Sequence, residues 1–572
     1  MFVTTIRSKQ KGKVYETHLV RRTFREKGEV RTETLANITK LPADVRDLVR
    51  RSLKGERCVP SSALEILSSR AHGHVALIRG VIGDVGLRSA LGSKRCRERQ
   101  LVEAMIVARI LAPQSKLATT RWWRTTTLPE ELEVEDATED ELYAALDWLA
   151  EQQPRIERRL ARECLQDGAL ILYDISSSYV TGRCCPLAAH GHSRDHRPDK
   201  PQVVYGVITN GDGCPVSVEV FAGNTSDTAT VMDQVRKVKE GFGLERLILV
   251  GDRGMIKQTR IEELRKIDGV DWISALDTAQ IRALVEGGDL QLGLFDERNL
   301  MEITSEHFPG ERLVVCRNPL LAAERARKRE ALLQATEQRL RSICAAVAAG
   351  RLKKGVAIAE RVGRAWGNQR MRKHFRIEID DGVFHFERDE KGIAREASLD
   401  GFYVIRTSVE DTRSYPADEV VRSYKRLSRV EHVFHNMKTT HLLVRPIYHY
   451  DERRVRAHIF LCMLAAHVVW HLEQRLADLL FHDPALDELN RTGDPVAPTP
   501  RSAEGVRKDT ELTSTDGGYP LHSLKTLLAA MGTLQRHTMR VANVQGASTW
   551  DQLSVPSQHQ RRVFEAAGVR LL

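Results

Sequence analysis

Three acidic side chains stand at positions that suit metal-dependent phosphodiester chemistry. Two apolar runs, residues 168–174 and 247–252, end in Asp174 and Asp252. Glu431 lies far downstream in a helical, basic segment. Strand ends present carboxylates side by side at one edge of a sheet, and a packed helix can add a third, which completes an oxygen cage for divalent cations. The three acids are therefore predicted to form one site.

Each acid alone also has an ordinary explanation. Asp174 and Asp252 can simply begin loops after buried strands, and Gly251 and Gly254 favour a turn at the second. Glu431 can be a solvated helix glutamate, although it borders an apolar stripe, where an unpaired charge is costly. We favour a shared site because all three acids are present and occur in the expected order along the chain.

The segment around Glu431 has the spacing of a helix with one polar edge. At about 100° per residue, Tyr424, Glu431 and Lys438 fall within about 20° of one line. Val430 and Phe434 lie on the adjacent flank. This helix is expected to bury one stripe and to present a tyrosine, a carboxylate and an ammonium group along its edge.

The elements around the two aspartates predict an α/β fold with a mixed sheet. The pattern is β-β-β-α-β-α-β, at residues 168–174, 203–209, 215–221, 227–241, 247–251, 258–267 and 270–276. The turn Asn210-Gly-Asp-Gly213 is a strong hairpin signal. Hairpin-linked strands followed by βα crossovers give a mixed sheet with helices against it. The first and fourth strands are then expected to lie side by side.

Shifts in composition predict five regions. We expect an N-terminal region (1–150), a first core segment (160–276), an inserted subdomain (277–400), a second core segment (401–476) and a linker with a helical tail (477–572). The N-terminal region begins with β-like stretches at 13–20 and 29–37 and continues with helical segments from 63–69 onward. Prolines and glycines predict a flexible linker at 477–520.

The charge favours a polyanionic partner. The 572 residues carry a net charge of +10, with 42% hydrophobic and 29% charged residues, as in ordinary soluble proteins. Residues 1–60 hold fifteen Lys/Arg against seven Asp/Glu. A solvated basic face is one explanation, and contact with nucleic acid is the favoured one.

Cysteine usage and hydropathy favour a cytoplasmic protein without a membrane partner. The nine cysteines are scattered without a CxxC pair, as in reduced proteins. Cys184-Cys185 and the histidines that follow do not match structural-zinc spacing. The first twenty residues lack the apolar stretch of a secretory signal. Residues 458–472 are too short to span a bilayer and predict a buried helix.

These residues resemble the DDE transposases of bacterial insertion sequences. Asp174, Asp252 and Glu431, with Tyr424 and Lys438, are similar to the branch that has a Tyr-x2-Arg-x3-Glu-x6-Lys signature and an insertion before the glutamate. Other similar segments are 191–199, 202–221, 223–227, 252–255, Arg445-Pro446 and Ala457-His458. The resemblance runs from about residue 10 to the C-terminus.

The chain departs from this signature at one position. Leucine stands at 427 where the signature has arginine, and the helix geometry lets Leu427 pack beside the apolar flank. The phosphate contact of the signature arginine is therefore in question. Arg426, Arg422 and Arg429 are the possible replacements for that arginine.

The resemblance implies an RNase H-like core with flanking helices, a mostly β insertion domain and a mainly helical N-terminal DNA-binding region. It implies that Asp174, Asp252 and Glu431 hold two Mg²⁺ ions, with Mn²⁺ as a substitute, for attack of water and then a 3′-hydroxyl on phosphodiesters.

The resemblance also implies DNA contacts. Tyr424 and Lys438 would hold the terminal phosphate, while Arg253 and Arg426 are further candidates. Two tryptophans, Trp272 and Trp366, either stack on an extruded base or fill the core, and the core is favoured.

The implied function is a cut-and-paste transposase. Its partners would be double-stranded DNA, at terminal inverted repeats and at the target, and further copies of the chain in a homodimer or larger synaptic assembly associated with the nucleoid. The alternatives are a DNA-binding protein without cleavage activity and an RNase H-like nuclease without strand transfer.

Overall fold

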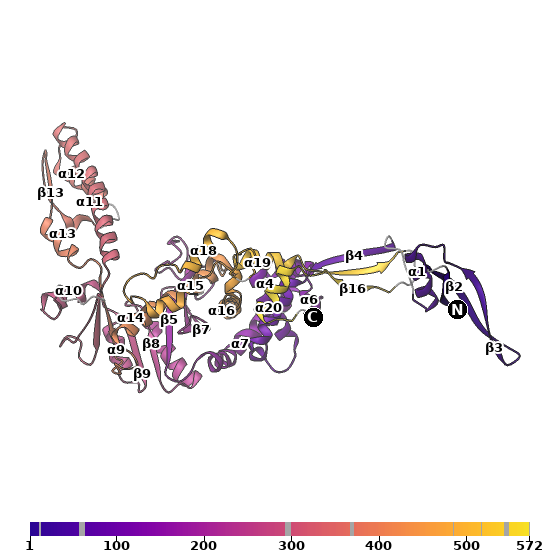
Figure 1. The fold of residues 1–572 in the computed structure, drawn as a ribbon. Helices are drawn as coiled ribbons and strands as arrows, with labels where there is room; N and C mark the ends of the chain where they lie inside the picture. The colour runs from indigo at the N-terminus through magenta and orange to yellow at the C-terminus, as the bar shows by residue number, and fades with distance from the viewer. Residues whose placement is uncertain are drawn as a thin grey trace. The chain divides into compact units, whose positions relative to one another are not determined.

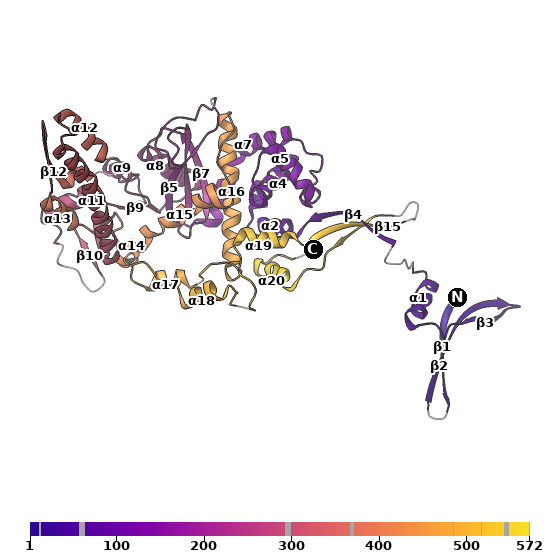
Figure 2. The same ribbon diagram turned by 90° about the horizontal axis from the view of Figure 1, so that it is seen from above.

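The chain forms two compact units, which Figures 1 and 2 show as ribbons. The first contains Met1–Ala71 and Leu534–Val555, and the second contains His72–Thr533 and Pro556–Leu572. The computed structural model describes residues 1–10, 13–56, 63–182, 184–291, 299–366, 371–483, 485–515, 517–542 and 548–570.

The first unit consists of two antiparallel three-stranded sheets and one helix. One sheet has the order β1-β2-β3 and the other β16-β15-β4. The elements are β1 (Phe2–Gln10), β2 (Lys13–Glu26), β3 (Glu29–Asn37), α1 (Ala43–Leu53), β4 (Leu64–Ala71), β15 (Gln535–Val541) and β16 (Trp550–Leu553). The strands expected at 13–20 and 29–37 are confirmed.

The helix expected at 63–69 is wrong, because this segment is β4. Its backbone pairs antiparallel with β15, so that Arg70 lies opposite Arg536. The two strands are separated by more than 450 residues, and a pairing so distant leaves no trace in the local pattern of β4.

The second unit is built on an eight-stranded mixed sheet. Its order is β10-β11-β14-β9-β8-β5-β6-β7. The strands are β5 (Ala169–Tyr179), β6 (Gln202–Asn210), β7 (Pro215–Ala222), β8 (Leu247–Val250), β9 (Val270–Ala275), β10 (Leu300–Ile303), β11 (Arg312–Arg317) and β14 (Phe402–Thr407). With α8 (Asp227–Arg236) and α9 (Gln258–Leu264), the predicted β-β-β-α-β-α-β order is confirmed.

The central pair of the sheet is β5 and β8, which run parallel as predicted. Their ladder ends with Leu172 opposite Val250. Asp174 and Asp252 each come two residues later, at matching positions. The prediction that the strand ends at Asp174 is wrong, since β5 continues to Tyr179 and pairs with β6 from Ile171 to Tyr179.

Buried hydroxyl groups explain why β5 extends beyond its apolar run. Ser177 and Ser178 are fully buried. The backbone N–H of Arg194 donates to Ser177 Oγ at 3.1 Å, and Ser178 Oγ lies 2.9 Å from the hydroxyl of Tyr205. Polar side chains that are satisfied in this way are compatible with a central strand, although in sequence they resemble a loop.

Helices pack beside β7. The N-terminal helices are α2 (Gly73–Asp84), α3 (Leu87–Leu91), α4 (Arg97–Leu111), α5 (Lys116–Trp122), α6 (Leu128–Leu132) and α7 (Glu139–Cys164). The long helix α16 (Glu452–Arg475) contacts β7, α4 and α7 (Figure 2). It is long and apolar enough to cross a membrane, but 83% of its most apolar window is buried inside the protein. The predicted buried helix at 458–472 is confirmed.

The insertion at 277–400 is mostly helical, so the expected mostly β domain is wrong. It contains α10 (Thr278–Glu286), α11 (Pro319–Ala348), α12 (Gly355–Trp366), the hairpin of β12 (Phe375–Asp380) with β13 (Val383–Arg388), and α13 (Glu390–Ala397). Its other strands, β10 and β11, extend the main sheet through β14.

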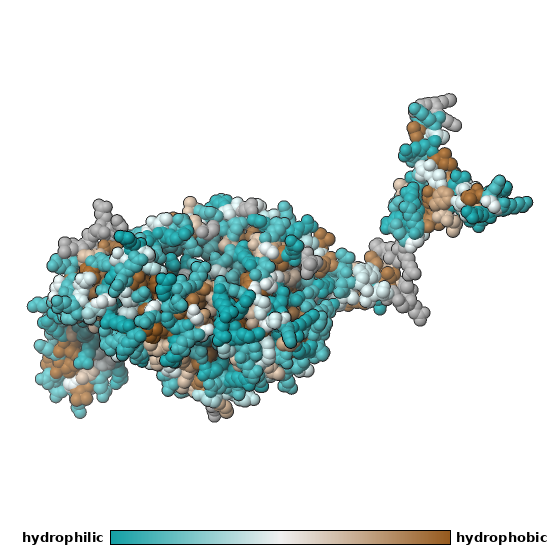
Figure 3. Space-filling model, turned by 90° about the horizontal axis from the view of Figure 1, so that it is seen from below, coloured by the Kyte–Doolittle hydropathy of each residue, from teal (hydrophilic) through white to brown (hydrophobic). Residues whose placement is uncertain are grey.

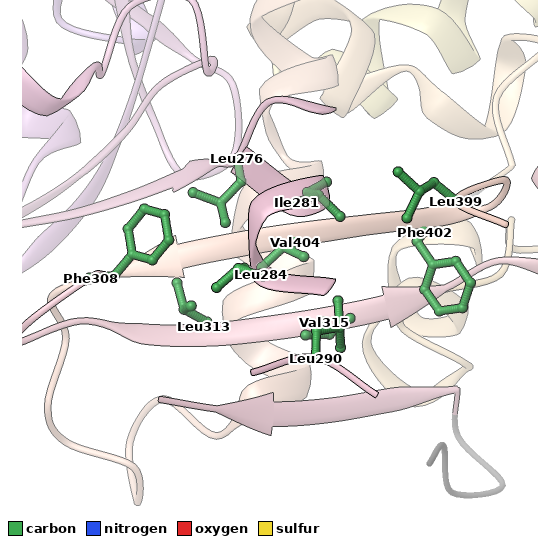
Figure 4. Close-up of a cluster of buried hydrophobic side chains, with 10 residues drawn as sticks. All are labelled: Leu276, Ile281, Leu284, Leu290, Phe308, Leu313, Val315, Leu399, Phe402 and Val404. Atoms are coloured by element: carbon green, nitrogen blue, oxygen red, sulfur yellow. The ribbon is translucent and has the colours of Figure 1, made fainter. Parts of the chain in front are cut away.

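Two apolar cores hold this insertion. In the first, Leu276, Leu284 and Val404 meet between α10 and the sheet (Figure 4). In the second, Trp366 packs against Phe375, with ring centroids 5.8 Å apart. Trp272 is a buried residue of β9. Trp272 thus fills the core as favoured, and Trp366 is partly buried against the second core.

The flexible linker expected at 477–520 is a packed segment instead. It contains α17 (Leu486–Thr492) and α18 (Ala503–Glu511). Asp483 accepts hydrogen bonds from the backbone N–H and hydroxyl of Ser502, at 2.8 and 2.6 Å. The side chain of Lys508 is fully buried and donates to the carbonyl of Ala477 at 3.1 Å. These long-range hydrogen bonds order a segment whose prolines and glycines alone predict flexibility.

The C-terminal part, expected to hold a helical tail, continues with α19 (Leu524–Gly532) and ends with α20 (Gln558–Ala567). The face shown in Figure 3 is largely hydrophilic with scattered hydrophobic side chains. This is the surface expected of a chain whose apolar side chains fill internal cores.

The core under α10 generates a stability prediction. Leu284 is fully buried, and its replacement by alanine leaves a cavity. Leu284→Ala should lower the free energy of unfolding by about 2–4 kcal/mol. Leu320→Ala, at a side chain that is 63% exposed, should change it by less than about 0.5 kcal/mol. Denaturant titration of both variants checks this, and equal losses would contradict the packing described.

Candidate active site

One cavity of about 820 Å³ brings the three predicted acids together. Asp174, Asp252 and Glu431 all line it. Asp174 lies in β5, Asp252 follows the end of the neighbouring strand β8 by two residues, and the glutamate comes from α15 (Leu427–His435). The structure thus joins three residues distant in the chain, whose catalytic role stays a prediction.

Asp174 occupies the least solvated position of the three. The backbone N–H of Ile175 donates to its Oδ1 atom at 2.8 Å. The pKa of Asp174 is raised to about 7, mainly by burial and also by the nearby charges of Asp252 and Glu431, while the Ile175 N–H and Arg194 act against this rise. Without a cation in the cavity, this carboxylate is therefore poorly stabilised in its charged form.

Asp252 lies at the exposed side of the cavity. The hydroxyl of Tyr424 donates to its Oδ1 atom at 3.4 Å, and the backbone N–H of Gly254 donates to Oδ2 at 3.5 Å. Burial raises the pKa of the Tyr424 hydroxyl, and the charge of Asp252 adds to this effect. Tyr424 therefore remains a neutral donor at the wall of the cavity.

Glu431 is exposed to solvent, so the predicted desolvation cost is wrong. Its helix buries Val430 and Phe434 instead, and the ring of Phe434 lies edge-on to Tyr205 of β6 with centroids 5.8 Å apart. The apolar flank anchors the helix to the sheet while the acid faces the cavity.

The predicted helical edge holds for two of its three residues. Tyr424, at the end of α14 (Ala417–Lys425), and Glu431 both line the cavity, whereas Lys438 is not among the residues that line it. The chain from Asn436 to Thr440 forms a π-helical turn. Such a turn holds more residues than an α-helical turn and moves the following side chains off the line.

Lys438 is held in a buried ion pair. Its Nζ atom lies 3.0 Å from Oδ1 of Asp195, whose side chain is 1% exposed. Arg445 pairs with the same carboxylate, and the backbone N–H of Tyr179 donates to Oδ2 at 3.1 Å. Burial lowers the pKa of Lys438, and Asp195 acts against this shift. In this arrangement Lys438 joins the end of β5 to the segment after α15, and its DNA contact stays a prediction.

The arginine candidates lie outside the carboxylate cavity. Arg253 is exposed and lines a neighbouring hollow together with Asp252 and Tyr424. Arg426 lies 3.2 Å from Glu419 and lines a separate basic hollow. Leu427 lines the carboxylate cavity itself. Arg422, Arg426 and Arg429 therefore line the basic hollow, whereas Leu427 takes the position at the carboxylate cavity.

One ion pair at the cavity was missed in the sequence. Arg194 donates through Nη2 to both carboxylate oxygens of Asp227, at 2.9 Å each. Both residues line the cavity, and the charge of Arg194 acts on Asp174. No spacing rule links Asp227 to a residue 33 positions earlier.

Comparison with known protein families adds an independent finding. Residues 186–468 match the family model described as the transposase DDE domain. The match supports a DDE transposase. The segment that resembles this transposase domain contains Asp252 and Glu431 and begins after Asp174.

Other comparisons are weaker. Among solved structures, the chain is similar to the cryo-EM structure of the piggyBac transposase synaptic complex with hairpin DNA, with 8% identity and a TM-score of 0.35. The similarity covers 80% of this chain and 76% of the other, and at this score it carries no argument. No curated protein matches the chain.

The raised pKa of Asp174 predicts a pH-dependent stability. The folded protein holds this proton up to about pH 7, whereas the unfolded chain releases it near the ordinary value of 3.8. Stability is therefore lost as the pH rises through this window, and Asp174→Asn removes the loss. With chelator present, the variant should be more stable than the parent by roughly 1–3 kcal/mol near pH 8, with a smaller gain near pH 5. A gain independent of pH, measured by denaturant titration, would contradict the assignment.

The Lys438–Asp195 pair predicts that substitution of Lys438 destabilises the protein even when no DNA is present. Lys438→Met leaves the buried Asp195 with Arg445 as its remaining side-chain cation among the described residues. The free energy of unfolding should fall by about 1–3 kcal/mol. Lys328→Met, at an exposed side chain of α11, is the matched control and should change little. If both variants unfold like the parent, the pair contributes no stability.

Proposed function

We propose that this chain is a cut-and-paste DNA transposase that cleaves DNA at the ends of an insertion sequence and joins those ends to target DNA. The observation that carries the proposal is the cavity shared by Asp174, Asp252 and Glu431. The family match over residues 186–468 supports the same reaction class.

The strand order supports an RNase H-like core. Five strands follow the order β7-β6-β5-β8-β9. The pairs β5–β6 and β6–β7 are antiparallel, whereas β5–β8 and β8–β9 are parallel. In this core Asp174 lies on β5 and Asp252 directly follows the adjacent strand β8. The helix α15 follows the insertion and returns to β5 with the glutamate.

The donor set fits hard divalent cations. Three carboxylates around one cavity repel each other, and oxygen ligands of this kind suit Mg²⁺, with Mn²⁺ as a substitute. Asp174, Asp252 and Glu431 would hold two such ions. When bound, the ions lower the pKa of water and stabilise charge on the attacked phosphate.

The remaining residues of the site would hold DNA. Tyr424 offers its hydroxyl beside Asp252, and Arg253 extends into the neighbouring hollow. The basic hollow adds phosphate contacts from Arg422, Lys425, Arg426 and Arg429. The excess of positive charge in residues 1–60 suits binding of double-stranded DNA.

The proposed reaction requires two element ends, so the active form is a homodimer or a larger assembly of this chain. Its place is the bacterial cytoplasm, on nucleoid DNA.

The test is an excision and joining assay. The substrate is a plasmid that carries the coding sequence with its flanking genomic DNA, incubated with purified protein and Mg²⁺. Asp252→Asn should lower cleavage on the order of a thousandfold, because it weakens cation binding and leaves DNA binding intact. Asp233→Asn, at an exposed carboxylate of α8, is the same chemical change outside the cavity and should cleave like the parent.

The products distinguish the alternatives. Excised ends joined to a second plasmid support the transposase. Cleaved ends that are never joined favour a nuclease, and a gel shift without metal-dependent cleavage favours a binding protein. Cleavage by Asp252→Asn at the parental rate would contradict the proposed site.

A further inference from the structure

Two thiols and two imidazoles meet in the second unit, outside the carboxylate cavity. Cys164 is the last residue of α7, and Cys214 follows the turn between β6 and β7. His467 and His471 are one helical turn apart on α16. None of the four lines the carboxylate cavity. They come from three elements that are distant in the chain, which is why no spacing rule predicted the cluster.

The distances within the cluster are close to those of metal ligands. The ligand atoms of Cys164, Cys214 and His467 all lie within 4.8 Å of one another. Cys214 Sγ is 3.4 Å from His467 Nδ1 and 3.9 Å from His471 Nε2. Around a tetrahedral zinc ion with ordinary Zn–S and Zn–N bonds, neighbouring ligand atoms lie roughly 3.4–3.8 Å apart. Three ligands therefore lie near this spacing, and His471, 3.9 Å from Cys214, is placed to supply the fourth after its ring moves closer.

Two of the four residues are buried, and one buried ring nitrogen lacks a partner among the residues that the structure describes. Cys214 and His467 are each 1% exposed. Nε2 of His467 has no hydrogen-bond partner within the described part of the chain. The described cysteines, Cys164 and Cys214 included, form no disulfide. Thiols are weak hydrogen-bonding partners, so the contacts of Cys214 with the two imidazoles stabilise its buried sulfur only weakly.

We propose that Cys164, Cys214, His467 and His471 bind one Zn²⁺ ion. Thiolate and imidazole ligands select zinc, whereas Mg²⁺ prefers oxygen ligands, so this site is chemically distinct from the carboxylate cavity. On binding, the two thiols release their protons. His467 moves its proton from Nδ1, which lies 2.9 Å from the carbonyl oxygen of Pro215, to Nε2, so that two protons leave for each ion bound.

The ion has a structural role. It ties the end of α7 and the β6–β7 turn to α16. The same turn supports α15, because Arg429 donates to the carbonyl oxygen of Gly211 at 2.7 Å and lies 3.1 Å from Asp212. Glu431 is two residues further along that helix. Zinc therefore stiffens the turn against which the glutamate helix packs.

The test measures metal binding on the full chain, without DNA. The protein is purified under reducing conditions, stripped with a chelator and titrated with Zn²⁺ in excess Mg²⁺, which occupies the carboxylate cavity. Zinc content and the spectrum after substitution of Co²⁺ are then recorded. We expect one zinc per chain, a thiolate-to-cobalt charge-transfer band and a higher melting temperature with zinc.

Matched variants locate the ion. Cys214→Ser and His467→Asn should lose the stoichiometric zinc and the charge-transfer band. Cys185→Ser, at another buried cysteine, should keep both. Because a buried change can prevent folding, His471→Asn at the partly exposed position is the second test, and it should weaken zinc binding at least tenfold in a folded protein.

Several results would overturn this proposal. They are a reduced parent protein that binds no zinc in excess Mg²⁺, equal zinc affinity in His471→Asn, loss of zinc in Cys185→Ser, or a Cys164–Cys214 disulfide in protein purified with zinc. These readouts do not depend on DNA cleavage, so failure of the zinc site and failure of the proposed transposase function are distinguishable.

Discussion

The parallel pairing of β5 with β8 is the constraint on which the candidate site depends. The ladder aligns Leu172 with Val250, and this register places Asp174 and Asp252 at the same level of the sheet. A slip by one residue would turn one aspartate to the opposite face. The strands hold this register because Ile171, Leu172 and the whole of β8 are buried. Apolar packing therefore offsets the repulsion between two carboxylates placed side by side.

The third acid is positioned by packing and not by a strand ladder. Val430 and Phe434 anchor one flank of α15 to the sheet, and Arg429 fastens it to the β6–β7 turn. Glu431 thus reaches the cavity from a separate layer. The position of Glu431 therefore depends on the order of the β6–β7 turn. The same turn leads to Cys214, so it connects the carboxylate cavity to the thiol and imidazole cluster.

The sequence predicted what local patterns determine. The strand order, the hairpin at Asn210, the buried helix α16 and the convergence of three acids all follow from periodicity and turn chemistry. The errors arise where distant contacts decide. Strand β4 is paired with a strand more than 450 residues away, and the segment around Lys508 is ordered by buried hydrogen bonds.

Side-chain partners were the least predictable feature of the site. Lys438 had the correct spacing, but it lies in a π-helical turn and pairs with Asp195. Arg194 and Asp227 form an ion pair at the cavity, and the cluster around Cys164 joins three elements. No sequence motif marks either set of residues. Such contacts depend on tertiary geometry, which spacing along the chain does not encode.

The most direct test of the shared site is cleavage of the protein backbone by bound iron. Fe²⁺ takes the place of Mg²⁺, and ascorbate with peroxide produces radicals that cut the chain next to the ion. The account predicts cuts at three distant places, beside Asp174, Asp252 and Glu431, all suppressed together by Mg²⁺ and all absent in Asp252→Asn. Cuts at only one of these places, or cuts that Mg²⁺ suppresses independently, would contradict a common cation site.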